Sequence, residues 1–475
     1  MKRAAARVAG IFLTAWYGAS PPVALATTCQ DVCPGSGTCT IAVGRTVTPG
    51  SDLDCSGRDI VLANPLGSLE VNDGLFTLRA ANLTIEATRH ITATSGASGL
   101  PFGLGLVLSG TFDATGFLRA NSGTRGGTIS VKAVGDIFVR HAEGETLGIR
   151  AVGETADDPG GRVRLTSGGA VLIEDEILAE NQGVSGNGAG GEIVIRASGD
   201  ITVNARLSVH GRGTGGAIAL TTGGNIDVNE PVVADGGGPS GNGGGIEMAA
   251  ARIVLNDALI AKGGLGASGG QAAGGSVELQ AGAFGITINS GIDVTGGAGG
   301  GGSITAESED DLTVSTGVTL ASQSTLNGGN GGSIALHAED QLTIGQSVTI
   351  DASGQTASGG EGSGADIDLD ACAVSIPASV TIDASGFHGG TVILAGRQSL
   401  TVGATVDASG TDSDGEIELA YRGTCSNVPT RTCGTNAECT VGCSTGQCSQ
   451  PNTTGAIFIP TPPELNNDRS LVPCL

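Results

Sequence analysis

The chain has 475 residues, of which 84 are glycine and only 3% are aromatic, and it carries a formal net charge of −24. Sugar rings and single-stranded bases are bound largely by stacking on exposed aromatic side chains, so this composition argues against glycan degradation and nucleic-acid binding. The acidic charge also opposes nucleic acid or an anionic membrane surface as a partner.

Residues 1–26 predict a secretory signal peptide. Three basic residues within the first seven precede a short apolar stretch, and Ala24-Leu25-Ala26 marks the expected cleavage site. Cleavage leaves 47 acidic and 20 basic residues, a formal charge of −27. No apolar run is long enough for a membrane span, so we predict a secreted, extracellular or outer-surface protein. A lipoprotein modified at Cys29 is the weaker alternative, because Thr28 stands where Gly, Ala or Ser is expected.

All eleven cysteines follow the predicted cleavage site, and ten of them form two groups near the ends of the chain. In an exported protein such groups predict disulfides, with three possible pairings for the first four cysteines and fifteen for the last six. Zinc is the weaker alternative because neither group contains a Cys-x-x-Cys pair or a histidine. The predicted disulfide cysteines are Cys29, Cys33, Cys39, Cys55, Cys425, Cys433, Cys439, Cys443, Cys448 and Cys474.

These groups suggest caps at both ends of a repetitive domain. We predict an N-terminal cap over residues 27–59, a small Cys-rich module over residues 423–450 and a Pro-containing tail over residues 451–475. Stapled caps would cover open strand edges and disfavour self-association through the ends of the domain. Cys372 lies apart from both groups on an alternating apolar run, and we predict that it is a buried free thiol.

Between residues 126 and 416 the sequence repeats a phrase of two small residues followed by alternating apolar positions. It reads GGTISV over residues 126–131, GGRVRL over 160–165 and GGEIVI over 190–195. Eleven such phrases follow one another at steps of 25 to 34 residues, with a mean near 29. A period of roughly 20 to 50 residues is typical of a solenoid or a propeller.

Within one period the alternation appears three times, which predicts three short strands. A propeller blade needs about four strands in roughly 40 to 45 residues, and a helical repeat would place glycines in helix interiors at about 1 kcal/mol each. We therefore predict an all-β fold, a parallel β-helix over residues 60–422 with about 29 residues and three strands per coil.

The phrase Val-Thr-Ile-Asp-Ala-Ser-Gly occurs over residues 348–354 and again over 380–386, with a shortened form over 405–410. It resembles the repeat of filamentous-haemagglutinin-type adhesins, and the Gly-Gly-x-Ile phrase is similar to repeats of polymorphic outer-membrane proteins. The resemblance covers roughly residues 126–420 and implies a right-handed, single-stranded parallel β-helix. Adhesins, capsular layers and polysaccharide lyases all use this scaffold, so the resemblance does not choose between them.

Three groups of carboxylates are candidates for active-site residues: Asp157-Asp158, Glu309 to Asp311, and the alternating Asp366, Asp368 and Asp370. We interpret all three as solvated turns or outer faces. The third group has no basic residue near it in the sequence, the five histidines lie at unrelated phases, and the motifs of polygalacturonases and pectate lyases are absent. No catalytic residue is predicted.

Asp351, Asp383 and Asp407 are expected at equivalent outward positions on successive coils, with Asp293 at the same phase two coils before Asp351. Like charges on neighbouring strands repel, so either solvent screens these carboxylates or a divalent ion bridges them. Calcium is the natural ion for oxygen ligands, and the first three aspartates are therefore candidate calcium ligands. No other cofactor is predicted.

The glycine-rich connections that precede each Gly-Gly phrase vary in length but fall at one phase of the coil. Insertions at one phase gather on one longitudinal edge, which predicts either a binding ridge or an inert edge that absorbs length variation. Our main hypothesis is a secreted or cell-surface structural or adhesive protein with an unidentified extracellular or cell-surface ligand and no catalytic activity. The alternatives are a pectate-lyase-like, polysaccharide-active enzyme and a calcium-dependent surface-layer or matrix protein.

Overall fold

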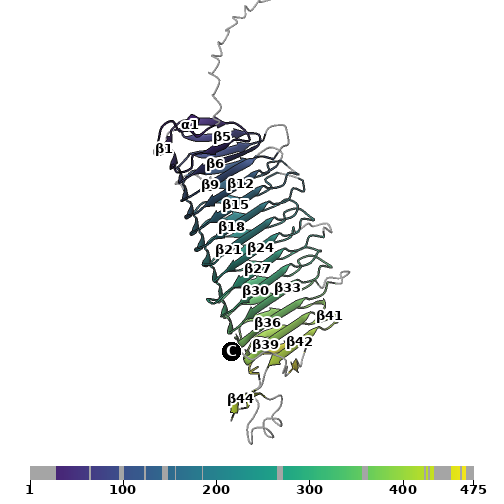
Figure 1. Cartoon of the computed structure of the whole chain (residues 1–475). Helices are drawn as coiled ribbons and strands as arrows, with labels where there is room; N and C mark the ends of the chain where they lie inside the picture. Colours follow the sequence, from purple (N-terminus) through teal and green to yellow (C-terminus); the bar gives the residue numbers. More distant parts are fainter. Residues whose placement is uncertain are drawn as a thin grey trace, which may run out of the picture.

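The computed structural model describes most of the chain from residue 28 onward (Figure 1). The described residues are 28–63, 66–95, 101–121, 125–141, 148–155, 157–183, 186–264, 271–355, 362–421, 424–425, 428–432, 451–460 and 463–466. The predicted signal peptide lies outside them, as do Cys433, Cys439, Cys443, Cys448 and Cys474.

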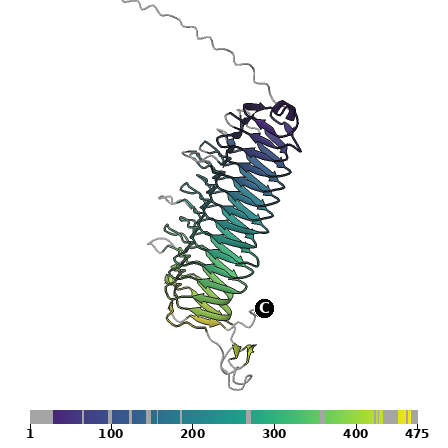
Figure 2. The same ribbon diagram turned by 90° about the vertical axis from the view of Figure 1, so that its left-hand side faces the viewer.

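The fold is a parallel β-solenoid, which confirms the predicted class. Each coil contributes one strand to each of three parallel ladders, and the coils stack along one axis (Figures 1 and 2). The long-strand ladder contains β3 (Asp52–Asp54), β6 (Leu75–Ala80), β9 (Gly103–Leu108), β12 (Thr128–Ala133), β15 (Arg162–Ser167), β18 (Glu192–Ala197), β21 (Ala217–Thr222), β24 (Gly245–Ala250), β27 (Ser276–Ala281), β30 (Ser303–Ser308), β33 (Ser333–Ala338), β36 (Asp366–Ile376), β39 (Thr391–Val402), β42 (Glu416–Tyr421) and β46 (Glu464–Asn466).

The second ladder is built from shorter strands and joins the first into one 27-stranded sheet, because β36 and β39 run through both ladders. Its other strands are β1 (Cys39–Ile41), β4 (Ile60–Leu62), β7 (Leu83–Ile85), β10 (Phe112–Ala114), β13 (Ile137–Val139), β16 (Val171–Ile173), β19 (Ile201–Val203), β22 (Asn225–Val228), β25 (Arg252–Leu255), β28 (Ile286–Ile288), β31 (Leu312–Val314) and β34 (Gln341–Ile344).

The third ladder is a separate 15-stranded sheet. It contains β2 (Gly44–Val47), β5 (Ser68–Asn72), β8 (His90–Thr94), β11 (Phe117–Asn121), β14 (Ile149–Arg150), β17 (Ile177–Leu178), β20 (Leu207–Ser208), β23 (Val232–Val233), β26 (Leu259–Ile260), β29 (Ile292–Asp293), β32 (Thr319–Ala321), β35 (Thr349–Asp351), β37 (Thr381–Asp383), β40 (Thr405–Asp407) and β45 (Ile457–Ile459). Two small pairs remain, β38 (Gly386–His388) with β41 (Gly410–Ser413) and β43 (Thr424–Cys425) with β44 (Val428–Thr432).

The core follows from the period-two alternation. In β33 the side chains of Ile334, Leu336 and Ala338 are buried, while the residues between them face outward. Ile334 pairs with Ile367 and Leu336 with Leu369 in the next coil, and such stacked positions form one continuous apolar core along the solenoid. Burying one such Ile or Leu side chain contributes about 1.5 to 3 kcal/mol.

The Gly-Gly phrase exists because the backbones of neighbouring coils approach closely at that point. A Cβ atom on Gly190 would lie 1.7 Å from the carbonyl oxygen of Val209, and one on Gly191 would lie 1.9 Å from the carbonyl oxygen of Gly161. Neither glycine has a positive φ, so close packing and not left-handed backbone explains this pair.

Asparagine side chains reinforce the corner between the second and third ladders. The Nδ2 atom of Asn229 donates to Oδ1 of Asn204 at 2.7 Å, and the same contact recurs at 2.8 Å from Asn256 to Asn229 and from Asn289 to Asn256. These hydrogen bonds run along the solenoid axis and join four successive coils.

The solenoid begins earlier than the predicted boundary at residue 60. Strands β1, β2 and β3 lie inside the predicted cap over residues 27–59, yet they pair with β4, β5 and β6 and form the first coil. Helix α1 (Cys29–Val32) precedes this coil. The predicted N-terminal disulfides are confirmed as Cys29–Cys55 and Cys33–Cys39. Sequence analysis missed the coil because the cysteines interrupt its short apolar alternations.

The solenoid also ends later than predicted. Strand β45 pairs with β40 and β46 pairs with β42, so the predicted tail over residues 451–475 supplies strands of a final coil. Asn452 continues the second ladder, since it accepts a hydrogen bond from the N–H of Val402 and donates one to the carbonyl of Leu400, both at 2.8 Å. The predicted module over residues 423–450 is therefore inserted within that coil, between its strand in the long-strand ladder and its segment in the second ladder. The sequence analysis had placed this module after the end of the solenoid.

Candidate functional site

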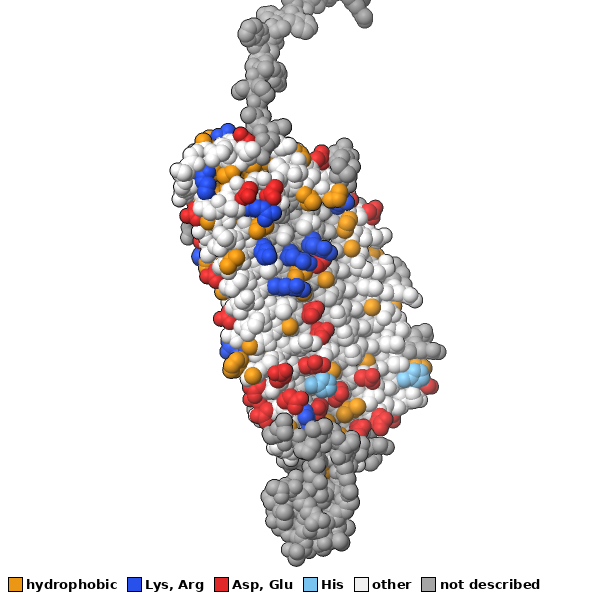
Figure 3. Space-filling view, in the orientation of Figure 1, with side chains coloured by type: hydrophobic (Ala, Val, Ile, Leu, Met, Phe, Trp, Pro, Cys, Tyr) orange, Lys and Arg blue, Asp and Glu red, His pale blue; other side chains and the backbone are white. Residues whose placement is uncertain are grey.

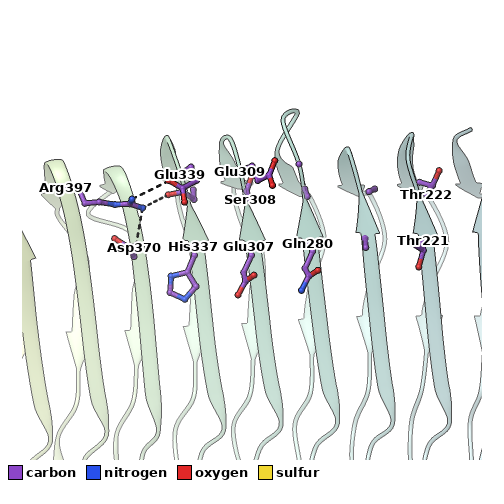
Figure 4. A pocket seen from close by; sticks show the side chains of 15 residues that line it. Thr221, Thr222, Gln280, Glu307, Ser308, Glu309, His337, Glu339, Asp370 and Arg397 are labelled. Carbon is purple, nitrogen blue, oxygen red and sulfur yellow. Dashed lines mark hydrogen bonds and ion pairs between the residues drawn. The ribbon is translucent and has the colours of Figure 1, made fainter. Parts of the chain in front are cut away.

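The long-strand ladder carries a shallow groove along its edge, near the corner with the second ladder (Figure 4). The groove follows the fifth position of successive strands, which are held in register from β21 to β36. These fifth residues are Thr221, Ala249, Gln280, Glu307, His337 and Asp370. A row that is neutral at β21 thus becomes charged toward β36.

Arg397 closes the C-terminal end of this groove. Strands β36 and β39 shift register after the pair Ala371–Gly396, and Arg397 lies in the bulge that follows. Its guanidinium donates from Nη2 to the carbonyl of Ala338 at 3.1 Å and to Oδ2 of Asp370 at 3.3 Å. Nη1 lies 3.5 Å from Oε2 of Glu339 (Figure 4). The side chain of Arg397 is only 11% exposed, so these contacts brace β33, β36 and β39 together.

Burial shifts the titration of the neighbouring carboxylates. It raises the pKa of Asp370 above its ordinary value, although Arg397 and His337 act in the opposite direction. Burial is also the largest cause of the raised pKa of Asp368, and His337 opposes that shift as well. The site combines partly buried carboxylates, an arginine and a histidine, which is a set of groups able to donate and accept protons.

The structure therefore overturns one step of the sequence interpretation. Asp366, Asp368 and Asp370 were taken to have no basic residue nearby, yet Arg397 forms an ion pair with Asp370 and His337 stands beside it in the register. His337 therefore lies at the same position of its strand as Asp370, in contrast to the unrelated positions expected for the histidines. Arg397 follows Asp370 by 27 residues, which is one coil. An alignment of successive repeats of the sequence would have placed Arg397 next to Asp370.

The predicted stacking of the aspartates is confirmed. Asp351 pairs with Asp383 and Asp383 with Asp407, while Asp293 lies two coils before Asp351 at the same position. Each Oδ1 atom accepts the backbone N–H two residues later, at 3.0 Å for Asp351, 2.9 Å for Asp383 and Asp407 and 3.1 Å for Asp293. These are Asx turns, in which the carboxylate stabilises the corner of the coil.

The calcium prediction gains no support from this geometry. Among the described residues, the groups of three ligand atoms that lie within 4.8 Å of one another are Cys29, Cys33 and Cys55, and Asp310, Asp311 and Asp340. The first group is occupied by disulfides. The second lies on exposed or half-buried turns, and burial together with Asp310 and Asp340 raises the pKa of Asp311. The stacked aspartates are in neither group.

The prediction of a free thiol at Cys372 is wrong. Cys372 is buried, as expected, but it is disulfide-bonded, and no described cysteine is free. The four N-terminal cysteines pair with one another, so the partner belongs to the C-terminal group, whose side chains lie outside the described residues. The odd number of cysteines indicated one unpaired thiol, and Cys372 was the wrong choice because distance along the sequence does not measure distance between coils.

The connections between the third ladder and the long-strand ladder project from one edge of the solenoid (Figure 2). This agrees with the single phase predicted for them. Parts of the longer connections, such as residues 265–270, lie outside the described residues. One short connection passes through β38, where Nδ1 of His388 lies 2.8 Å from Oγ of Ser413 in the next coil.

No family model, no curated protein and no solved structure matches this chain. In the described part of the chain, no helix has the length and apolar character needed to cross a membrane.

Proposed function

We propose that this chain is an exported structural or adhesive scaffold that acts outside the cell or on its surface. The observation that carries the proposal is the use of its polar side chains. The stacked aspartates cap turns, the asparagine ladder joins coils, and Arg397 braces three strands. Polar groups that would mark a functional site in another fold are here engaged in holding neighbouring coils together.

Two further features support export. The first 26 residues have the pattern of a signal peptide, and the first coil is closed by two disulfides, which persist in oxidising compartments. A stack that is held by many repeated contacts and closed by disulfides resists unfolding outside the cell, where no chaperone assists it. These are properties that a scaffold needs and that an intracellular protein does not.

The experiment combines localisation with attachment. The full chain is expressed in a bacterial host with residues 1–26 intact, cells are fractionated, and the purified protein is assayed for binding to cells and extracellular matrix. We expect the protein outside the cytoplasm and attachment that weakens in salt. A variant that lacks residues 265–270, in the connection from β26 to β27, tests the edge between the third ladder and the long-strand ladder. The control is Phe284→Ser, at the exposed turn between β27 and β28 on a different edge. Cytoplasmic retention, or no attachment to any surface, would contradict the proposal.

A second candidate function is cleavage of an acidic polysaccharide. His337, Asp370 and Arg397 line an open groove, and Asp368 lies two positions before Asp370 on β36, which favours this function. New reducing ends or unsaturated uronate absorbance would report cleavage of polygalacturonate or alginate. Activity that disappears in Asp368→Asn but persists in the control Asp383→Asn would establish this function instead of the scaffold.

A further inference from the structure

The outward face of the long-strand ladder is divided by charge (Figure 3). A basic band occupies its N-terminal part and consists of Lys132, Arg162, Arg164 and Arg196 on β12, β15 and β18, all exposed. Glu192 is the acidic residue among them and pairs with Arg162 at 2.5 Å. Four positive charges against one negative charge leave this band basic in a strongly acidic chain.

An acidic band occupies the C-terminal part of the same face. It consists of Glu247, Glu278, Glu307, Asp366, Asp368 and Asp370, on β24, β27, β30 and β36. In the long-strand ladder, the fully described strands β24, β27, β30, β33 and β36 contain neither Lys nor Arg. Strand β21 lies between the two bands and carries no charge.

Small side chains occupy most of the other outward positions between β21 and β33, so few long side chains stand between the two bands. The small residues are Ala217, Ala219, Gly245, Ser276, Ser303, Thr305, Ser333 and Ala335. Two sheet faces with such side chains pack at about 10 Å from each other.

We propose that two copies of this chain pair through these faces in an antiparallel manner, so that the basic band of each copy lies on the acidic band of the other. A twofold axis that lies in the interface, parallel to the strands and on β24, places β12 of one copy over β36 of its partner, β15 over β33, β18 over β30 and β21 over β27. Lys132 of each copy then faces Asp370 of the other, and Arg196 faces Glu307, because each pair occupies the fifth position of its strand. The interface is isologous and closes, so it gives a dimer and not a fibre.

The size of the face is sufficient for a stable dimer. Nine strands from β12 to β36 at about 4.8 Å spacing and six residues at about 3.3 Å each give roughly 850 Å² per copy. A standard protein interface buries about 800 Å² per partner. This pairing is lateral and leaves the ends of the solenoid untouched, so it is independent of the caps and of the proposed adhesive role.

Salt distinguishes local complementarity from the overall charge. Two chains that each carry −24 repel one another, and added salt would strengthen any association limited by that repulsion. Attraction between the basic band of one copy and the acidic band of the other is instead screened by salt, so added salt should weaken this association. We therefore expect a dimer at about 50 mM salt that dissociates toward monomers at about 1 M salt, as measured by sedimentation velocity.

Charge-reversal variants provide the decisive test. The variant R162E/R164E/R196E reverses three of the four charges of the basic band, and E278K/E307K/D366K reverses three of the six charges of the acidic band. We expect each alone to be monomeric, with a dimer dissociation constant raised at least tenfold, and an equimolar mixture of the two to form a heterodimer. The control R140E/R252E reverses charges on the second ladder and should dimerise like the wild type, and circular dichroism checks that every variant folds.

Three results would overturn the proposal. One is a wild-type chain that stays monomeric at low salt and about 100 µM, well above the micromolar dissociation constants of weak complexes. Another is dimers that persist in each charge-reversal variant, or a mixture that forms no heterodimer. The third is a monomer whose basic band is instead saturated by an anionic polysaccharide such as heparin, with retention that the R162E/R164E/R196E variant loses.

Discussion

The middle of the solenoid and its two ends are stabilised in different ways. From β12 to β35 every coil repeats the same backbone contacts, with glycine at the points of closest approach, and no described residue in this stretch forms a disulfide. The ends depart from the repeat, one with a helix and two disulfides, the other with an inserted module and a disulfide at Cys372. A coil in the middle is stabilised by two neighbours, whereas a terminal coil has only one and needs covalent closure.

The largest effect is expected at the N-terminal end. Cys29→Ser/Cys55→Ser removes a crosslink between residues 26 positions apart, which should lower the free energy of unfolding of this end by about 3.5 kcal/mol. Hydrogen exchange should accelerate in β1 to β6 and stay slow in β27 to β33. A uniform acceleration along the chain would show that the ends and the middle do not behave differently.

In the middle, a single methyl group on an anchor glycine should destabilise the stack. A Cβ on Gly191 meets a backbone oxygen at 1.9 Å, so Gly191→Ala should cost about 2 to 3 kcal/mol in chemical denaturation. Gly223→Ala is the matched control, because its Cβ would meet nothing closer than 3.7 Å, and it should change stability by less than about 0.5 kcal/mol. Equal effects would refute close packing as the reason for the Gly-Gly phrase.

The asparagine ladder should contribute less. Asn256→Ala removes two side-chain hydrogen bonds and should reduce stability by about 1 kcal/mol. In Asn225→Ala the described hydrogen bond is kept, because it comes from the backbone N–H. The denaturation midpoints of the two variants are compared. Equal midpoints for Asn256→Ala and Asn225→Ala would show that the asparagine ladder does not contribute to stability.

The smallest effect concerns pH, and it differs in sign between the two halves. Burial raises the pKa of Asp351, Asp368 and Asp370 in the folded state, so their protonated forms are favoured by folding. Their contribution to stability is fully present below the unfolded pKa, about 3.9, and is lost as pH rises through the folded values. Burial lowers the pKa of His90, whose contribution is present above about 6.5 and is lost as pH falls.

Acidification from pH 7 toward about 4.5 should therefore protect β35 to β39 and loosen β8, as measured by hydrogen exchange corrected for intrinsic rates. Asp351→Asn keeps an Asx-turn acceptor without the charge and should weaken the acid protection around β35. The same pH response in both halves would contradict the cited shifts.

The sequence predicted the parts of the fold that depend on period. The alternation in residues 334–338 and the stacking of Asp351 on Asp383 both follow from side-chain periodicity and repeat length, and both are confirmed. It failed where an element departs from the repeat. The final coil is split by an insertion of about 30 residues, which no period reveals, and Ile457 to Ile459 then continue the third ladder.

Sequence analysis identified the aspartates of the candidate site but not Arg397, again because Arg397 lies where the chain departs from the regular repeat. Asp368 and Asp370 are visible as a pattern within one strand, whereas Arg397 belongs to the next coil and enters through a bulge that changes the register. The partner of Asp370 is therefore a neighbour in space and not along the sequence. The charge division of the long-strand face is likewise visible only when strands are placed in their ladder.

The most direct test of an exported, disulfide-closed scaffold is a count of its free thiols. The protein is produced with its first 26 residues, collected from outside the cytoplasm, unfolded without reductant, alkylated and mapped by mass spectrometry. With eleven cysteines in the chain and Cys372 in a disulfide, we predict one labelled cysteine per chain, in the C-terminal group, and no label on Cys372 or on the four N-terminal cysteines. Ten or eleven labelled cysteines would contradict both the disulfide closure and the exported location.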